Sequence, residues 1–146
     1  MRLPVHLPVL FPPVKIGKRY YLDGGVADSV PYRRAFEKGC DKVIVILTRS
    51  RDYIKKQEKS FRLAQKLYRD YPAFIKTLKN RPQSYNRRLQ DLYRAEREGR
   101  VFVLAPEDTL GIGRTESSPQ KLRALYEEGY YQAKESMHAL HLYLQK

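Results

Sequence analysis

The stretch YYLDGGVADSVP, Tyr20 to Pro31, decides the expected fold because it joins an extended run to a helical one through an aspartate and two glycines. The aromatic and leucine residues before Asp23 favour a half-buried strand. Gly24 and Gly25 then allow the chain to turn sharply. Ligands bind at the carboxyl ends of strands in open α/β sheets, so Asp23 is well placed for chemistry. The alternative is that Asp-Gly-Gly is only a loop, since these are common turn residues.

Two further runs predict parallel strands that are buried on both faces. They are KVIVILT, residues 42–48, which is a continuous and largely β-branched run, and VFVLA, residues 101–105, which is an apolar run ended by Pro106. A short helix over residues 31–38, capped by Gly39, is expected before the first of them. We therefore predict the α/β class, with two central parallel strands, a third strand entering at Asp23, and helices outside.

The region from residue 49 to residue 100 is predicted to be helical and strongly basic. Its apolar residues mark three helix faces, and Pro72 and Pro82 are expected to separate three helices because proline breaks a helix interior. The region holds 16 Lys or Arg and 6 Asp or Glu, a net charge of +10 out of +13 for the chain. The basic excess is therefore local.

A long helix is predicted over residues 119–145, with Ser118 as its cap and Pro119 as its first residue. Gly129 lies within its apolar stripe. Because glycine costs a helix about 1 kcal/mol relative to alanine, we expect the backbone to pack closely against another element there. With 146 residues and 42% hydrophobic residues, the chain is long enough to bury a core.

Leu7 to Arg49 as one unit resembles the carboxyl-terminal part of a bacterial patatin-like phospholipase domain. The residues that carry the resemblance are Phe11, Pro12, Pro13, Asp23, Gly24, Gly25 and Pro31. Ser29 departs from the asparagine of many members and indicates a bacterial subgroup. A looser likeness continues over residues 101–133. The resemblance implies a partial three-layer fold, a short parallel sheet flanked by helices whose amino-terminal half is missing, so residues 1–146 are expected to form a single partial domain.

The resemblance also implies an activity. In the family, the aspartate of this loop is the base of a serine–aspartate dyad that hydrolyses lipid esters, which gives Asp23 that role and places Gly24 and Gly25 in the active-site loop. The GxSxG motif that would carry the serine is absent from the sequence, as is a glycine-rich oxyanion loop. We therefore expect the chain to be inactive alone and to need a complementary amino-terminal half, or to self-associate. The expected ligand is a lipid or ester substrate.

Two other hypotheses remain open. The basic helices, with tyrosines between their charges, form a module that binds an anionic membrane or nucleic acid. No nucleic-acid motif is recognised, and the phospholipase resemblance favours the membrane. Alternatively, the chain is a truncated remnant without catalysis.

Cofactors and metals are not expected. GIGRTESSP, residues 111–119, lacks the third glycine of a dinucleotide fingerprint and is predicted to be a loop. His138 and His141 have no further ligand at metal spacing, and His6 lies in a leader outside the resemblance. The single Cys40 fits a reducing compartment and is expected to be buried. The first fourteen residues fail as a signal peptide, and no apolar run approaches the roughly 20 residues that span a bilayer, so we expect a cytoplasmic protein, with peripheral membrane contact at most.

Overall fold

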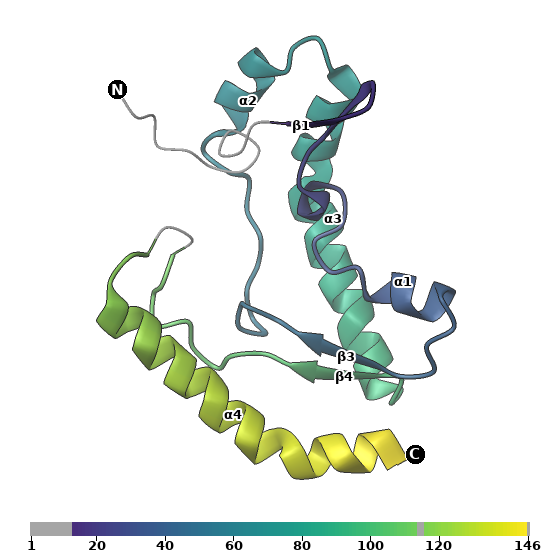
Figure 1. Cartoon of the computed structure of the whole chain (residues 1–146), viewed down its shortest axis with the longest axis vertical. Coiled ribbons are helices and arrows are strands. Elements are labelled where there is room, and N and C mark those ends of the chain that lie inside the picture. Colours follow the sequence, from purple (N-terminus) through teal and green to yellow (C-terminus); the bar gives the residue numbers. More distant parts are fainter. Residues whose placement is uncertain (1–12, 114–115, 146) are drawn as a thin grey trace. The chain divides into compact units, whose positions relative to one another are not determined.

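The computed structural model describes residues 13–113 and 116–145 and has a mixed α/β structure (Figure 1). Its elements, in chain order, are β1 (Val14–Ile16), β2 (Arg19–Tyr21), the 3₁₀ helix η1 (Gly24–Val26), α1 (Tyr32–Glu37), β3 (Val43–Ile46), α2 (Phe61–Leu67), α3 (Pro72–Arg97), β4 (Val101–Leu104) and α4 (Pro119–Gln145). The α/β class is confirmed. The expectations for His6, Phe11 and Pro12 lie outside the described residues.

The chain divides into two compact units. The described part of the first unit comprises residues 13–31 and 54–90, and that of the second comprises residues 32–53, 91–113 and 116–145. Helix α3 contributes its first part to one unit and its last part to the other. The first unit holds Asp23, and the second holds the parallel strands.

Strands β1 and β2 form an antiparallel hairpin in the first unit, with Val14 paired to Tyr21 and Ile16 to Arg19. Gly17 has a φ of 60°, which the first position of a tight two-residue hairpin turn requires. The prediction that a third parallel strand enters at Asp23 is therefore wrong. The strand before Asp23 pairs with its immediate neighbour in sequence because the turn at Gly17 returns the chain on itself.

Strands β3 and β4 pair in parallel, in register from Val43 with Val101 to Ile46 with Leu104, and this pairing confirms the two predicted parallel strands. The prediction that both faces are buried is wrong for β3. Ile44 is 42% exposed and Ile46 is 73% exposed, whereas Val45 is buried. Residues on a strand alternate between two faces, and within the described chain only one face of β3 is covered.

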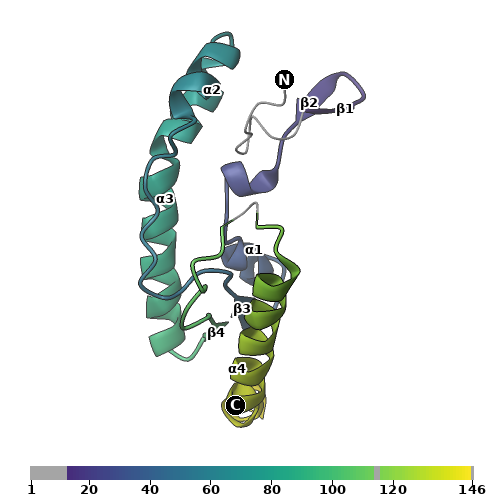
Figure 2. The same ribbon diagram turned by 90° about the vertical axis from the view of Figure 1, so that its left-hand side faces the viewer.

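Helix α3 continues through Pro82, so the prediction of a break at that residue is wrong, although α3 does begin at Pro72. Figure 2 shows α3 as one continuous ribbon. Leu78, Leu89 and Leu92 are buried along it. We attribute the continuity to this burial on both sides of Pro82, which offsets the roughly 3 kcal/mol that an interior proline costs a helix.

Helix α4 begins and ends as predicted, and Tyr143 in its last turn forms hydrogen bonds with the backbone at the start of the parallel strands. The Tyr143 hydroxyl donates to the carbonyl oxygen of Arg100 over 2.8 Å and accepts the N–H of Val43 over 2.9 Å. The expected close packing at Gly129 is wrong, because a Cβ built there would meet no described atom within 4 Å. Much of the apolar stripe of α4 is exposed.

Helix α1 ends at Glu37, and the predicted Gly39 caps it. The N–H of Gly39 donates to Phe36 and that of Cys40 donates to Ala35, and Gly39 has a φ of 87°, which together form a Schellman cap. The expectation that Cys40 is buried is wrong, since its side chain is exposed. Cys40 lies in the turn that follows the cap and not in the apolar strand that comes after it.

Candidate functional site

Asp23 directly follows the hairpin and caps the 3₁₀ helix η1. Its Oδ1 accepts the backbone N–H of Gly25 over 2.8 Å, and its carbonyl oxygen accepts the N–H of Val26 over 3.1 Å. The Ser29 hydroxyl donates to the carbonyl oxygen of Gly25 over 2.6 Å. The loop that holds the carboxylate is therefore fixed by its own hydrogen bonds, while the Asp23 side chain remains exposed.

The two glycines have different roles in this loop. Neither adopts a positive φ, so the sharp turn is a 3₁₀ turn and does not need the left-handed conformation for which glycine was expected. A Cβ built at Gly25 would lie 3.2 Å from Asp23 Oδ1, whereas a Cβ at Gly24 would meet no described atom within 4 Å. Gly25 thus leaves room for the carboxylate to approach the backbone.

Asp23 lines an apolar groove of about 600 Å³ in the first unit. On one side lie Asp23, Gly24, Tyr20 and Leu22 from the hairpin and loop. The other side is built by the helical segment at the junction of α2 and α3, through Tyr68, Tyr71, Phe74 and Thr77. The rings of Tyr68 and Phe74 pack edge to face, with centroids 4.9 Å apart, against a core of Val26, Ala64 and Leu78. The groove therefore places a carboxylate beside a surface suited to an alkyl chain.

A polar recess of about 210 Å³ adjoins the groove, and the two share Val26, Ala27 and Thr77 as lining residues. The polar lining comes from successive turns of one face of α3, through Thr77, Asn80, Arg81, Ser84 and Arg88, and from Ser29 of the loop. Arg88 forms an ion pair with Asp28, which partly neutralises its charge. An apolar groove thus leads into a recess rich in hydrogen-bond donors.

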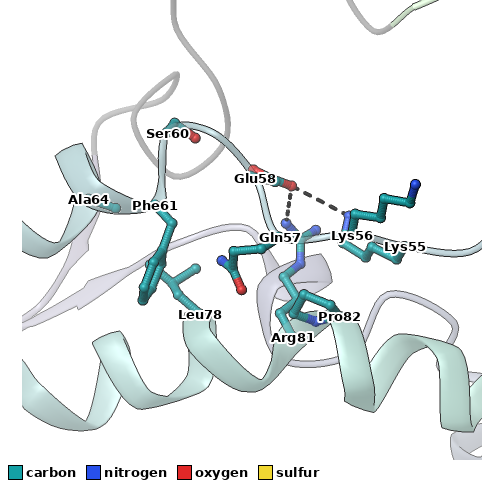
Figure 3. Close-up of a pocket in the computed structure, with 10 residues that line it drawn as sticks. All are labelled: Lys55, Lys56, Gln57, Glu58, Ser60, Phe61, Ala64, Leu78, Arg81 and Pro82. Atoms are coloured by element: carbon teal, nitrogen blue, oxygen red, sulfur yellow. Dashed lines mark hydrogen bonds and ion pairs between the residues drawn. The ribbon is translucent and has the colours of Figure 1, made fainter.

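A buried ion-pair cluster anchors the loop before α2 to α3 (Figure 3). Glu58 Oε1 lies 3.0 Å from Arg81 Nη1 and 3.4 Å from Lys55 Nζ. The backbone N–H of Lys55 also donates to Asn86 Oδ1 over 2.9 Å. The cavity at this cluster is about 20 Å³, enough for about one water molecule and not for a substrate. We assign the cluster a structural role.

Charge is divided unequally between the two units. By sequence, the first unit holds 15 Lys or Arg and 4 Asp or Glu, a net charge of +11, and the second holds 14 and 12, a net charge of +2. The basic excess therefore belongs to the unit that contains Asp23. Anionic ligands are attracted to this unit more strongly than to the other.

The carboxyl ends of the parallel strands carry a separate pocket of about 440 Å³ in the second unit, lined by residues that include Arg51, Asp52, Glu107 and Ser136.

Two hydrogen bonds of 2.7 Å join Arg51 to Glu96, and this pairing raises the pKa of Arg51 above its usual value. Burial raises the pKa of Tyr93 above 10.0. Asp23 does follow the carboxyl end of a strand, β2, as expected, but β2 belongs to the antiparallel hairpin. The expectation that Asp23 lies at the ligand-binding edge of the parallel sheet is wrong, because the parallel strands belong to the other unit.

The described residues contain no group of three or more His, Cys, Asp or Glu side chains arranged to hold a metal ion. His138 and His141 both lie on α4. Within the described chain, no helix combines the length and the apolar character needed to cross a membrane.

The pattern of the sequence did not identify the residues of the groove wall as site residues. In the sequence, Tyr68, Tyr71 and Phe74 are among the apolar positions of the predicted helices, and Thr77 belongs to no motif. Roughly fifty residues separate them from Asp23, and a single sequence carries no signal for that pairing. Of the predicted site residues, Asp23 and Gly24 line the groove, while Gly25 touches it only through its hydrogen bond to Asp23.

A family model described as a domain of unknown function, DUF6363, matches residues 71–145. The match covers just over half of the chain and runs from the start of α3 through β4 to the end of α4, so it does not include Asp23. No curated protein and no solved structure matches the chain. The match names no activity, so the resemblance to patatin-like phospholipases stays a hypothesis. The chain belongs to the family defined by the DUF6363 domain.

Proposed function

We propose that this chain supplies the base and the acyl-binding groove of a lipid acyl hydrolase that works through a serine–aspartate dyad. The observation that carries the proposal is the position of the Asp23 carboxylate on the wall of an apolar groove of about 600 Å³. A site for an apolar ligand with few polar groups at defined positions is the expected form of a lipid ester site.

The proposed chemistry requires one proton acceptor from this chain. Asp23 takes the proton of a serine hydroxyl while that oxygen bonds to the ester carbonyl carbon. The alcohol then leaves with the proton, and water hydrolyses the acyl-enzyme to release the fatty acid. An aspartate is a weak base in water, so it acts only when held within hydrogen-bond reach of the hydroxyl. The bond from Gly25 to Oδ1 orients the carboxylate, and no described side chain donates to Oδ2.

The serine and the oxyanion donors are proposed to come from a complementary polypeptide. The 146 residues contain no GxSxG motif. Asp23 is exposed, so a complementary polypeptide can reach it. Docking of that polypeptide would remove water from the Asp23 carboxylate and strengthen its interaction with the serine hydroxyl. This role accounts for a formed groove beside an exposed carboxylate in 146 residues that contain no GxSxG motif.

The groove and its recess together favour a lipid with one apolar chain and a polar head. The alkyl chain of the lipid would lie along an apolar wall formed by Tyr68, Tyr71 and Phe74. Ser84 and Arg88 of the adjoining recess offer donors to the oxygens of a head group. The two lining sets meet at Thr77, so one ligand can occupy both.

The experiment is hydrolysis of a short-chain aryl ester by the chain alone and after mixing with an amino-terminal patatin-like polypeptide that carries GxSxG. We expect activity only in the mixture, and we expect Asp23→Asn to abolish it. Asp70→Asn is the matched control, because Asp70 is an exposed aspartate of the same unit that lies outside the groove.

Circular dichroism must first show that the variants fold as the unaltered chain does. Equal loss in the Asp23→Asn and Asp70→Asn mixtures would contradict the role of Asp23. So would an absence of activity in a mixture whose two polypeptides are shown by sedimentation to associate.

A further inference from the structure

The hairpin β1–β2 carries an apolar face with no protein covering it among the described residues. Val14 and Ile16 are each 62% exposed and Tyr21 is 47% exposed. Residues that are paired across an antiparallel ladder lie on the same face, so the register places Val14, Ile16 and Tyr21 together. Every residue of both strands is exposed.

The opposite face of the hairpin borders the Asp23 groove. Lys15 is paired with Tyr20, which lines that groove, and Lys15 Nζ lies 5.9 Å from the centroid of the Tyr20 ring. Tyr20 is itself 65% exposed, so the two faces differ in position and chemistry and not in exposure: one belongs to the groove, and the other carries Val14 and Ile16. An isolated two-stranded hairpin is marginally stable in water, so a surface that covers the face of Val14 and Ile16 would also stabilise the hairpin.

The charges around this face define the chemistry of what covers it. Residues 13–22 contain Lys15, Lys18 and Arg19 and no acidic residue. Lys18 sits in the two-residue turn at the tip, beside Gly17, and Arg19 shares the apolar face with Ile16. The whole first unit has a net charge of +11. Exposed aliphatic residues ringed by cations and next to tyrosines are the composition that lies at the boundary of an anionic bilayer.

We propose that the hairpin β1–β2 is an interfacial anchor, which inserts Val14, Ile16 and Tyr21 into the surface of an anionic lipid bilayer while Lys18 at its tip and Arg19 contact the head groups. Each basic residue near such a surface adds electrostatic attraction to the anionic lipids. A nucleic acid would engage the same cations through its phosphates, but it offers no partner for the aliphatic side chains. This inference concerns the surface alone and does not depend on the proposed hydrolysis.

The first test is co-sedimentation of the chain with vesicles of phosphatidylcholine, with and without about one third phosphatidylglycerol. We expect binding to the anionic vesicles only, and we expect the double substitution Val14→Asp and Ile16→Asp to weaken it by about tenfold or more. The double substitution Ile54→Asp and Leu67→Asp is the matched control, because it adds the same two charges at residues that are 68% and 57% exposed and that lie in the same unit outside the hairpin. Equal losses in the two variants would overturn the proposal, because the position of the added charges would then be immaterial.

A second measurement reports insertion directly. The chain has no tryptophan, so a single introduced tryptophan is an unambiguous fluorescent reporter. We expect the emission of Ile16→Trp to shift to shorter wavelength with anionic vesicles and to be quenched by brominated acyl chains, and we expect Ile54→Trp to change little.

Binding to vesicles without a shift in Ile16→Trp would show that the basic helices dock while the hairpin stays in water, and would overturn the proposal. Sedimentation with double-stranded DNA in the same buffer gives the competing outcome. Tighter binding to DNA that the Val14→Asp and Ile16→Asp substitutions leave unchanged would assign the basic unit to nucleic acid instead.

Discussion

Gly25 donates its backbone N–H to Asp23 Oδ1 over 2.8 Å, and a Cβ built on Gly25 would lie 3.2 Å from that same oxygen. Asp23 Oδ1 therefore accepts a hydrogen bond from Gly25 and also fills the space that a side chain at position 25 would need. A 3.2 Å approach is tighter than nine in ten Cβ contacts, so any larger residue at position 25 must displace the carboxylate by a few tenths of an ångström. Gly25 is a positioning residue for Asp23.

Gly25→Ala is therefore expected to lower the hydrolysis rate of the complemented enzyme without unfolding the chain. A base that is displaced from its position accepts the proton more slowly, so we expect kcat to fall about tenfold while KM changes little. Gly24→Ala is the matched control, because its Cβ would meet no described atom within 4 Å. Steady-state kinetics of both variants makes the comparison. Equal rates in the two variants would contradict a positioning role for Gly25.

Tyr71→Ser is expected to weaken binding of an alkyl chain in the groove. Tyr71 is 60% exposed, so its loss leaves the core intact while it removes apolar wall next to Asp23. We expect the affinity for decanol, measured by titration calorimetry, to fall about fivefold, which corresponds to about 1 kcal/mol. Tyr126→Ser on α4 removes a ring that is also well exposed, at 71%, from the other unit and should leave the affinity unchanged. An equal loss of decanol affinity in both variants would show that decanol binds outside the groove.

The start of α4 is expected to respond to acid through Glu116. The backbone N–H groups of Ser118 and Ser117 and the ammonium of Lys121 all donate to its carboxylate, and they hold its pKa below the ordinary 4.5. Because the folded-state pKa is lowered, this stabilisation is present above pH 4.5 and is lost as the pH falls through the lowered value.

Amide NMR shifts of Ser117 and Ser118 should therefore titrate with a midpoint below 4.5. The variant Glu116→Gln should show no such transition while α4 stays helical, since glutamine does not ionise. A midpoint at or above 4.5 in the unaltered chain would contradict the hydrogen-bonded geometry of the carboxylate.

Local patterns in the sequence were enough to predict several elements. The two apolar runs predicted to be strands, residues 42–48 and 101–105, contain β3 and β4, and the Ser118-Pro119 pair marks the start of α4. Gly39 caps α1 because its φ of 87° suits a residue without a side chain. These features depend on propensity and capping within a few residues, and a single sequence records both.

Features that depend on distant contacts were not predictable in the same way. Pro82 reads as a helix end, yet the buried leucines on either side keep α3 continuous. The alternating pattern of exposure on β3 follows from how many layers cover the sheet, and the run of apolar residues does not contain that information. The groove depends on side chains of the α2–α3 region meeting Asp23, a pairing set by packing of the whole first unit.

The most direct test of the central claim is whether Asp23 activates a serine on the complementary polypeptide. A fluorophosphonate probe labels a serine rapidly only when a base activates the hydroxyl for attack on phosphorus, a reaction that expels fluoride and needs no turnover of a lipid ester. We predict that adding the chain speeds labelling of the GxSxG serine by about a hundredfold or more, and that the Asp23→Asn chain does not, although it still associates with the complement. Labelling that is equally fast with the unaltered and Asp23→Asn chains would show that Asp23 is not the base.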